Sequence, residues 1–283
     1  MTLTPDQLCA TNFSYLRCTL DRWLDDMAEL EVEHVELWGV SPHLYVDDTT
    51  SRQVDAIRRK LTERELNLTC FCPEQVMYPV NIAAADPTLR DRSIAYFHRC
   101  AEVAAQLGAP ILFCTSGWNT LDEDPAQAWE RSRDALASIA ERADQLGLTC
   151  VLEALQPVES HIVTTSADIA RMREEIGAPN LEVALDTGAM VAAGETILDY
   201  TSKGDLAHVH FVDGAPTGHL AWGDGDRPLA TWLQDLADAD YTGFLSLETI
   251  ADRYWLDPLP PVRQSFERIT AAMREAERTT PAP

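Results

Sequence analysis

The stretch TCVLEALQPVESHIVTTSADIARMREEIGAPNLEVALD, residues 149–186, decides the fold. It opens with the apolar run TCVLEAL (149–155), continues with an amphipathic segment that predicts a helix from Ser166 to Ile176, and closes with a second apolar run, LEVALD (181–186). Gly177 follows the predicted helix directly, at the position where glycine most often ends a helix. Strand, helix and strand in this order form one unit of a parallel sheet, because parallel neighbours need a crossover connection.

The same alternation of short apolar runs and longer amphipathic segments recurs about eight times along the chain. The other predicted strands are a first one near Ala10 to Tyr15, HVELWG (34–39), LTCFC (68–72), ILFCT (111–115), AHVHFVD (207–213) and GFLSLE (243–248). The other predicted helices cover 20–30, 51–64, 87–107, 125–146, a segment near Ile197, 228–239 and 260–276. Continuously apolar strands are typical of a parallel sheet covered on both faces. Since no Gly-x-Gly-x-x-Gly follows the first strand, these units predict an α/β fold, a single (β/α)8 TIM barrel domain over 1–283, rather than an open doubly wound sheet.

The composition argues against several classes of partner. Of 283 residues, 46% are hydrophobic and 24% are charged, and 22 Lys and Arg against 46 Asp and Glu give a net charge of −24. Nucleic acids and anionic membranes bind clustered cations, so neither is expected as a partner. We expect a cytoplasmic protein, because the amino terminus has no basic segment followed by an apolar one. The seven cysteines, an odd number without a Cys-x-x-Cys pair, predict buried free thiols in a reducing compartment.

Ligand-type side chains end four consecutive predicted strands. Glu153 and Asp186 end the fifth and sixth, His210 lies late in the seventh, and Glu248 ends the eighth. The carboxyl ends of barrel strands meet on one rim, where the active sites of such barrels lie, so these side chains should be neighbours. Three carboxylates in a partly desolvated pocket repel one another unless a cation neutralises them. Three oxygen ligands and one imidazole predict a divalent metal site, with Mn²⁺ as the first choice and Mg²⁺ or Co²⁺ as alternatives.

Two further residues belong near this rim. His208 and His210 are two positions apart and face the same way along a strand. We interpret His210, nearer the carboxyl end, as the ligand and His208 as a packed or orienting histidine. Glu159 follows Glu153 on the loop over the rim, where it could contact a hydroxylated substrate. Taken singly, each of these residues could also be a helix cap, a core group or a solvated loop residue.

Several segments together resemble a known family. They are VELWGVSPH (35–43), CPEQVMYPVN (72–81), LEALQPVESHIV (152–163), LDTGAM (185–190), HVHFVDG (208–214), HLAWGDGD (219–226) and GFLSLET (243–249). In this order they resemble the xylose isomerase-like sugar isomerase/epimerase superfamily, within it the ketose 3-epimerases, and among these the fructoselysine 3-epimerases. Two positions depart from the pattern, since many ketohexose 3-epimerases have a His and an Arg where this chain has Ala189 and Pro216.

The resemblance implies roles for individual residues. One metal would be bound by Glu153, Asp186, His210 and Glu248. Glu153 and Glu248 would also act as the acid/base pair on opposite faces of the substrate. The implied sugar contacts are Glu159 and His219, with a pocket wall made by Trp38, His43, Glu74 and Trp118. The resemblance also implies assembly, so a homodimer or homotetramer is expected.

Removal of a proton beside a ketose carbonyl gives an enediolate, and the fate of this species separates three reactions. Return of the proton to C3 from the other face is a 3-epimerisation, which we take as the first interpretation. Return to the neighbouring carbon is an aldose-ketose isomerisation, and loss of a β-hydroxyl is the reaction of a dehydratase or lyase of the 3-dehydroshikimate dehydratase kind. The expected substrate is an unphosphorylated ketose or a fructosyl-amine, because residues 174–226 hold no Arg and only Lys203 near the usual phosphate loops.

Two other function classes stay open. The superfamily includes an apurinic endonuclease, but a DNA groove needs the basic surface that this composition lacks. A non-catalytic sugar-binding protein would have no need of paired glutamates at strand ends.

Overall fold

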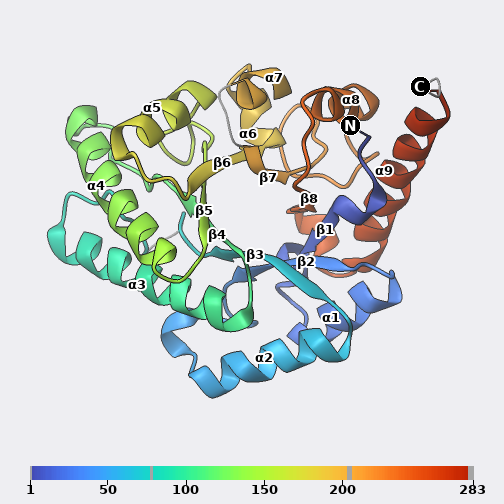
Figure 1. The fold of residues 1–283 in the computed structure, drawn as a ribbon, viewed down its shortest axis with the longest axis horizontal. Helices are drawn as coiled ribbons and strands as arrows, with labels where there is room; N and C mark the ends of the chain where they lie inside the picture. Colours follow the sequence, from blue (N-terminus) through green and yellow to red (C-terminus); the bar gives the residue numbers. More distant parts are fainter. Residues whose placement is uncertain (1, 77–78, 203–205, 280–283) are drawn as a thin grey trace.

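The strands of the protein close into a barrel (Figure 1). The computed structural model describes residues 2–76, 79–202 and 206–279, and in them parallel strands pair in the order β1 to β8, with β8 paired back to β1. The strands are β1 Leu8–Thr11, β2 His34–Gly39, β3 Asn67–Pro73, β4 Ile111–Thr115, β5 Thr149–Glu153, β6 Leu181–Asp186, β7 Leu206–His210 and β8 Phe244–Leu247. The predicted (β/α)8 TIM barrel is confirmed.

Helices form an outer layer around the strands (Figure 1). They are α1 Leu20–Glu29, α2 Ser51–Glu63, α3 Pro87–Leu107, α4 Pro125–Asp144, α5 Ser166–Ile176, α6 Thr187–Ala192, α7 Ile197–Thr201, α8 Leu229–Asp238 and α9 Leu259–Thr279. Short 3-10 helices are η1 Pro5–Gln7, η2 Phe13–Tyr15, η3 Val46–Asp48 and η4 Asp252–Tyr254. The Asp86 carboxylate caps the start of α3, and Gly108 ends α3 with a left-handed backbone, φ 88°.

The first predicted strand, Ala10 to Tyr15, is wrong in its bounds. β1 covers Leu8–Thr11, and Phe13–Tyr15 forms η2 instead. Asn12 turns the chain between them, because its side chain accepts a hydrogen bond from the Trp38 N–H (2.7 Å) and donates one to the Trp38 carbonyl (3.1 Å). These side-chain bonds replace the backbone pairing that would have continued the strand.

Two other differences lie beside the predicted metal ligands. β7 ends at His210, before the predicted end at Asp213, and the Val212 N–H donates to the Thr187 hydroxyl (2.9 Å) rather than to a strand. Helix α6 starts directly after β6 and was not predicted. Asp186 caps this helix, with Oδ1 accepting a hydrogen bond from the Ala189 N–H at 2.6 Å.

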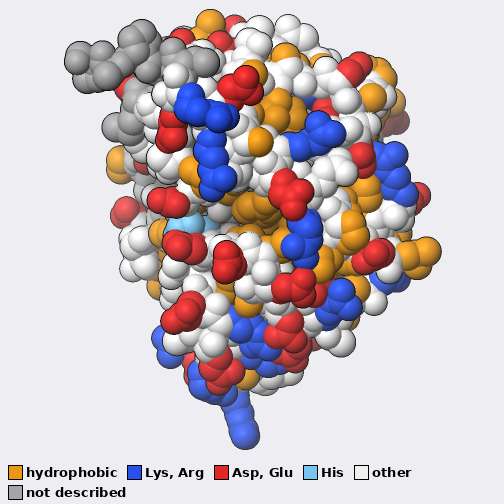
Figure 2. Space-filling view, turned by 90° about the vertical axis from the view of Figure 1, so that its right-hand side faces the viewer, with side chains coloured by type: hydrophobic (Ala, Val, Ile, Leu, Met, Phe, Trp, Pro, Cys, Tyr) orange, Lys and Arg blue, Asp and Glu red, His pale blue; other side chains and the backbone are white. Residues whose placement is uncertain are grey.

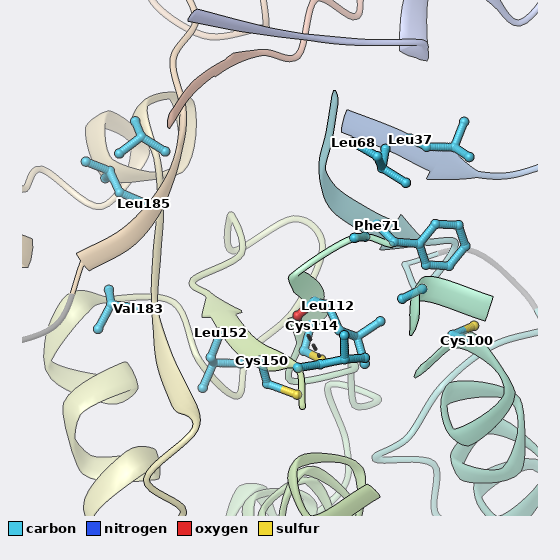
Figure 3. Close-up of a cluster of buried hydrophobic side chains, with 14 of the residues drawn as sticks. Leu37, Leu68, Phe71, Cys100, Leu112, Cys114, Cys150, Leu152, Val183 and Leu185 are labelled. Carbon is cyan, nitrogen blue, oxygen red and sulfur yellow. Dashed lines mark hydrogen bonds between the residues drawn. The ribbon is translucent and has the colours of Figure 1, made fainter. Parts of the chain in front are cut away.

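Alternate side chains of the strands build two cores. The larger core includes Leu37 on β2, Leu152 on β5 and Leu185 on β6, whose side chains are drawn in Figure 3. Inside the barrel lies a smaller cluster made of Trp38, Cys70, Cys72, Phe113, Val151 and Ala184. Successive strand residues alternate between the two faces of the sheet, so residues two positions apart point the same way. Glu153 and Asp186 follow the interior residues Val151 and Ala184 by two positions and therefore also point inward.

The cysteines largely match the expectation of buried free thiols. All seven cysteines are free thiols; Cys18 is partly exposed and the others are buried. On the face that carries α1 and α9, basic side chains are interspersed with acidic ones (Figure 2). Within residues 2–76, 79–202 and 206–279, no helix is both long enough and apolar enough to cross a membrane.

Candidate metal centre and active site

Four side chains meet at the carboxyl-terminal rim of the barrel, and we call them the strand-end set. Its members are Glu153 of β5, Asp186 of β6, His210 of β7 and Glu248, which directly follows β8. Ligand atoms of Glu153, Asp186 and His210 lie within 4.8 Å of one another, and so do those of Asp186, His219 and Glu248. The structure therefore brings together the four residues that the sequence singles out and places His219 beside them.

His210 lies between the two glutamates of the set. Its Nδ1 is 3.4 Å from Glu153 Oε1 and 3.2 Å from Glu248 Oε2. His219 approaches the same glutamate, with Nδ1 3.0 Å from Glu248 Oε2 and Nε2 3.6 Å from Asp186 Oδ1. The whole strand-end set is buried, while His219 is partly exposed at its edge.

In the protein without a cation, the pKa values of Glu153 and Glu248 shift in opposite directions. Burial raises the pKa of Glu153 to about 8. Burial acts on Glu248 in the same direction, but the charges and contacts of His210 and His219 outweigh it and lower the pKa of Glu248 to about 2. Burial also opposes the charge of His219, yet Asp186 and Glu248 raise its pKa to about 10. The two glutamates therefore differ in proton affinity in the cation-free protein.

Three buried polar atoms of this site make no well-aligned hydrogen bond among the described residues. They are Asp186 Oδ2, His210 Nδ1 and His219 Nδ1, and the two histidine nitrogens face glutamate oxygens at ion-pair distance instead. Such atoms are rare in folded proteins, so each calls for an explanation. Asp186 Oδ1 caps α6, which leaves Oδ2 as the oxygen available to a ligand. Three carboxylates and an imidazole nitrogen that converge in this way fit a divalent cation.

Glu36 is a buried carboxylate beside the strand-end set that the sequence reasoning missed. It lies on β2, with 1% of its surface exposed. Its Oε1 accepts a hydrogen bond from His210 Nε2 (3.1 Å) and its Oε2 accepts one from His208 Nε2 (2.8 Å). Burial disfavours its charge, but the two histidines hold the pKa of Glu36 well below its ordinary value. The available signal was an acidic residue inside the largely apolar run HVELWG.

A cavity of about 400 Å³ adjoins the set. It is lined by the whole strand-end set and by four of the predicted substrate contacts, Trp38, Glu74, Glu159 and His219. Glu159 accepts a hydrogen bond from the Gln156 N–H at 3.0 Å, and burial raises its pKa. Among the described lining residues there is neither Lys nor Arg.

The sides of the cavity are apolar and include residues that the sequence reasoning did not single out. These are Phe13, Leu16, Val76, Ile250 and Trp255. Phe13 stacks on Trp38 with ring centroids 3.6 Å apart and planes within 5°. A polar end at the strand-end set and apolar sides are typical of a small-molecule site.

Two predicted wall residues, His43 and Trp118, are not among those that line the cavity. His43 Nδ1 accepts a hydrogen bond from the Asn12 amide (2.7 Å), and its Nε2 donates to the Cys18 carbonyl (3.0 Å). Burial lowers the pKa of His43, in keeping with a neutral ring held between two loops. The backbone of Trp118 is held by the Asn81 side chain, which donates to its carbonyl (2.8 Å) and accepts from its N–H (3.1 Å).

Comparison with known proteins agrees with this barrel. The family model described as "Xylose isomerase-like TIM barrel" matches residues 24–272. The chain belongs to the xylose isomerase-like TIM barrel family. This membership confirms the family resemblance that the strand-end motifs indicate.

Proteins similar to this chain include sugar epimerases. A fructoselysine 3-epimerase of Shigella flexneri is 27% identical over 266 residues, 93% of this chain and 96% of that protein. A D-psicose 3-epimerase of Agrobacterium fabrum is 23% identical over 232 residues, 80% of this chain and 78% of that protein. The solved structure of an L-ribulose 3-epimerase has a TM-score of 0.80 at 19% identity, covering 97% of this chain and 99% of that one, and so supports the fold.

Proposed function

We propose that this protein is a divalent metal-dependent ketose 3-epimerase acting on an unphosphorylated ketose or a fructosyl-amine. The observation that carries the proposal is the pair of glutamates, Glu153 and Glu248, which approach His210 Nδ1 to 3.4 and 3.2 Å and line one cavity. The similarity to a fructoselysine 3-epimerase and a D-psicose 3-epimerase supports a 3-epimerisation.

Glu153, Asp186, His210 and Glu248 would hold the metal, with Mn²⁺ as the first choice and Mg²⁺ or Co²⁺ as alternatives. When bound, such an ion supplies Lewis acidity, which makes the proton beside the substrate carbonyl easier to remove. The unpartnered atoms Asp186 Oδ2 and His210 Nδ1 support this assignment, because a cation would satisfy both.

The protein's own residues supply the proton transfers. One of Glu153 and Glu248 removes the proton from C3 of the ketose, and the other returns a proton from the opposite face of the planar enediolate, which inverts C3. His219 and Glu159, which line the same cavity, would bind sugar hydroxyls.

The lining of the cavity favours a neutral or amine-bearing substrate. Glu74 and Glu159 are carboxylates, and the described lining has no cation to bind a phosphate. Apolar side chains such as Phe13 and Trp255 would contact the aliphatic part of a substituent attached to the sugar. Ala189, which replaces the histidine of many ketohexose 3-epimerases, lies in this lining and leaves room there.

The first experiment is exchange in D₂O. The Mn²⁺-loaded protein is incubated with a panel of unphosphorylated ketoses and fructosyl-amines, and NMR follows deuterium incorporation and product stereochemistry. We expect deuterium at C3 with an inverted product. Label at C1 or C2 would instead indicate an aldose-ketose isomerase, and the absence of exchange with every sugar, despite bound metal, would favour a dehydratase or lyase.

Assembly is a separate proposal. We infer a homodimer or homotetramer from the resemblance to family members, and light scattering coupled to size exclusion measures it. A monomer at micromolar concentration would contradict the proposal.

A further inference from the structure

The barrel interior holds a charged group that the proposed reaction does not use. Glu36 is 1% exposed, and its two oxygens accept hydrogen bonds from two different histidines of β7, at 3.1 Å from His210 and 2.8 Å from His208. A buried carboxylate is costly, and it is retained only where hydrogen bonds compensate for its lost hydration. Its position therefore depends on both histidine rings, and their positions depend on it.

The ring of His210 is constrained in two independent ways. Phe113 of β4 stacks on it with ring centroids 4.5 Å apart and planes within 8°, which sets the plane of the ring. Glu36 binds Nε2, which sets the rotation of the ring within that plane. With Nε2 held, Nδ1 faces Glu153 and Glu248.

The chemistry of the acceptor selects the tautomer. An ionised carboxylate can only accept hydrogen bonds, so each histidine must present N–H at Nε2. In the metal-bound protein, a neutral His210 with its proton on Nε2 would have its lone pair on Nδ1, the atom that faces Glu153 and Glu248 at 3.4 and 3.2 Å. Carboxylates that bind the distal N–H of a metal-bound histidine fix its tautomer and increase its basicity.

From this geometry we propose that Glu36 is a positioning residue, which holds His210 with Nδ1 free and aimed at the cation of the strand-end set. The proposal rests on the proposed function only in requiring that the set bind a metal. It assigns no proton transfer to Glu36 and no contact with the substrate.

The test compares substitutions at two residues of similar burial, Glu36 and His208. In Glu36→Gln the amide can accept from one histidine but must donate toward the other, so it cannot keep both rings in the Nε2–H form. In the control His208→Gln, the new amide can still donate to Glu36, and the bond from Glu36 to His210 remains. Binding of Mn²⁺ alone, without substrate, is titrated by the electron paramagnetic resonance signal of free Mn²⁺.

We expect Glu36→Gln to weaken Mn²⁺ binding by about 10- to 100-fold and His208→Gln by less than about 3-fold. A purely structural role would lower the melting temperature of both metal-free variants similarly and leave both dissociation constants near that of the unsubstituted protein. Equal dissociation constants for the two variants would overturn the proposal.

A second measurement needs no variant and so does not depend on the folding of Glu36→Gln. Long-range ¹H–¹⁵N spectra of the Mg²⁺-loaded protein, labelled at histidine, report which ring nitrogen of His210 carries the proton. We expect Nε2–H, and Nδ1–H would contradict the proposal. If the unsubstituted protein binds no metal, the proposed function fails; if it binds metal and epimerises a ketose but His210 is Nδ1–H, only the role of Glu36 fails.

Discussion

Glu153 and Glu248 carry the same functional group in different surroundings. Glu248 contacts both His210 (3.2 Å) and His219 (3.0 Å), whereas Glu153 has one histidine at 3.4 Å. The second imidazole explains why Glu248 stays ionised in the cation-free protein while burial keeps the pKa of Glu153 at about 8. In the cation-free protein the proton affinity of each carboxyl group thus depends on its neighbours.

Glu248→Gln tests the proposed acid/base role of Glu248 by kinetics. The amide oxygen can still face a cation but cannot take up a proton, so we expect kcat to fall by at least about 100-fold with metal still bound. Metal content per chain and deuterium exchange at C3 are the measurements. In the control Glu159→Gln, which changes a proposed sugar contact, we expect a larger change in KM than in kcat. Near-full turnover of metal-loaded Glu248→Gln would refute its acid/base role.

The pKa of Glu153 predicts how the stability of the metal-free protein depends on pH. The folded protein keeps the Glu153 proton up to about pH 8, whereas the unfolded chain loses it near its ordinary pKa of 4.5. The folded state therefore binds the extra proton, and this contribution to stability is complete below the unfolded pKa and is lost as pH rises toward 8. The raised pKa of His219, about 10, extends the decline above pH 6.5.

Glu153→Gln cannot titrate and is the matched variant for this effect. Urea unfolding of the metal-free proteins between pH 5 and 8 should show a decline that is shallower in the variant, by up to about 1.4 kcal/mol per pH unit. Parallel pH profiles for the two proteins would mean that Glu153 has no raised pKa.

At the scale of elements, the turn after β1 shapes one side of the cavity. Asn12 holds the backbone of Trp38 through bonds of 2.7 and 3.1 Å and the ring of His43 through one of 2.7 Å. It also directs the chain into η2, whose first residue, Phe13, stacks on Trp38. One buried amide therefore couples the end of β1 to the aromatic wall.

Asn12→Ala removes this coupling. Since buried groups of Trp38 and His43 lose their partner, we expect the free energy of unfolding to fall by about 2–4 kcal/mol and KM to rise as the Phe13 and Trp38 rings become less constrained. Urea unfolding and steady-state kinetics measure both. Asn67→Ala, at the exposed start of β3, is the control and should change stability by less than about 0.5 kcal/mol. Equal stabilities for the two variants would show that the Asn12 bonds contribute little.

At the scale of the whole molecule, the strand-end set joins four consecutive strands. A cation bound to it links β5, β6, β7 and the segment after β8 in the folded state only, because the unfolded chain separates these residues. Metal binding should therefore stabilise the barrel as a unit.

Chelation measures this stabilisation. At Mn²⁺ about 100-fold above its dissociation constant we expect about 2.7 kcal/mol, which raises the melting temperature by about 5 °C relative to protein treated with a chelator. His210→Gln, which lacks the central nitrogen ligand, should show little difference between the two conditions. An unchanged melting temperature and metal content after chelation would exclude the strand-end metal site.

Much of the barrel could be predicted from local signals. The order of the βα repeats could be predicted because its signals are local in sequence. Apolar runs and amphipathic segments indicate burial, and glycines indicate where helices end. The grouping of Glu153, Asp186, His210 and Glu248 followed as well, because parallel strands in a barrel end on one rim.

Other features depended on contacts between distant segments. Glu36 meets His208 and His210 only because the barrel closes and β2 and β7 both turn side chains into its interior. In strands that are apolar on both faces, the period of two does not show which face is inside. The bounds of β1 depended on the Asn12–Trp38 bonds, and the start of α6 on the carboxylate of Asp186.

The sequence by itself thus determined the fold class and the identity of the candidate ligands, because both follow from patterns along the chain. Only the tertiary structure decided which nitrogen of His210 is free, which carboxyl keeps a proton and which aromatic rings line the cavity. These properties depend on distances of 3 to 4 Å between strands and loops far apart in sequence, and burial makes hydrogen bonding and charge sensitive to each of those distances.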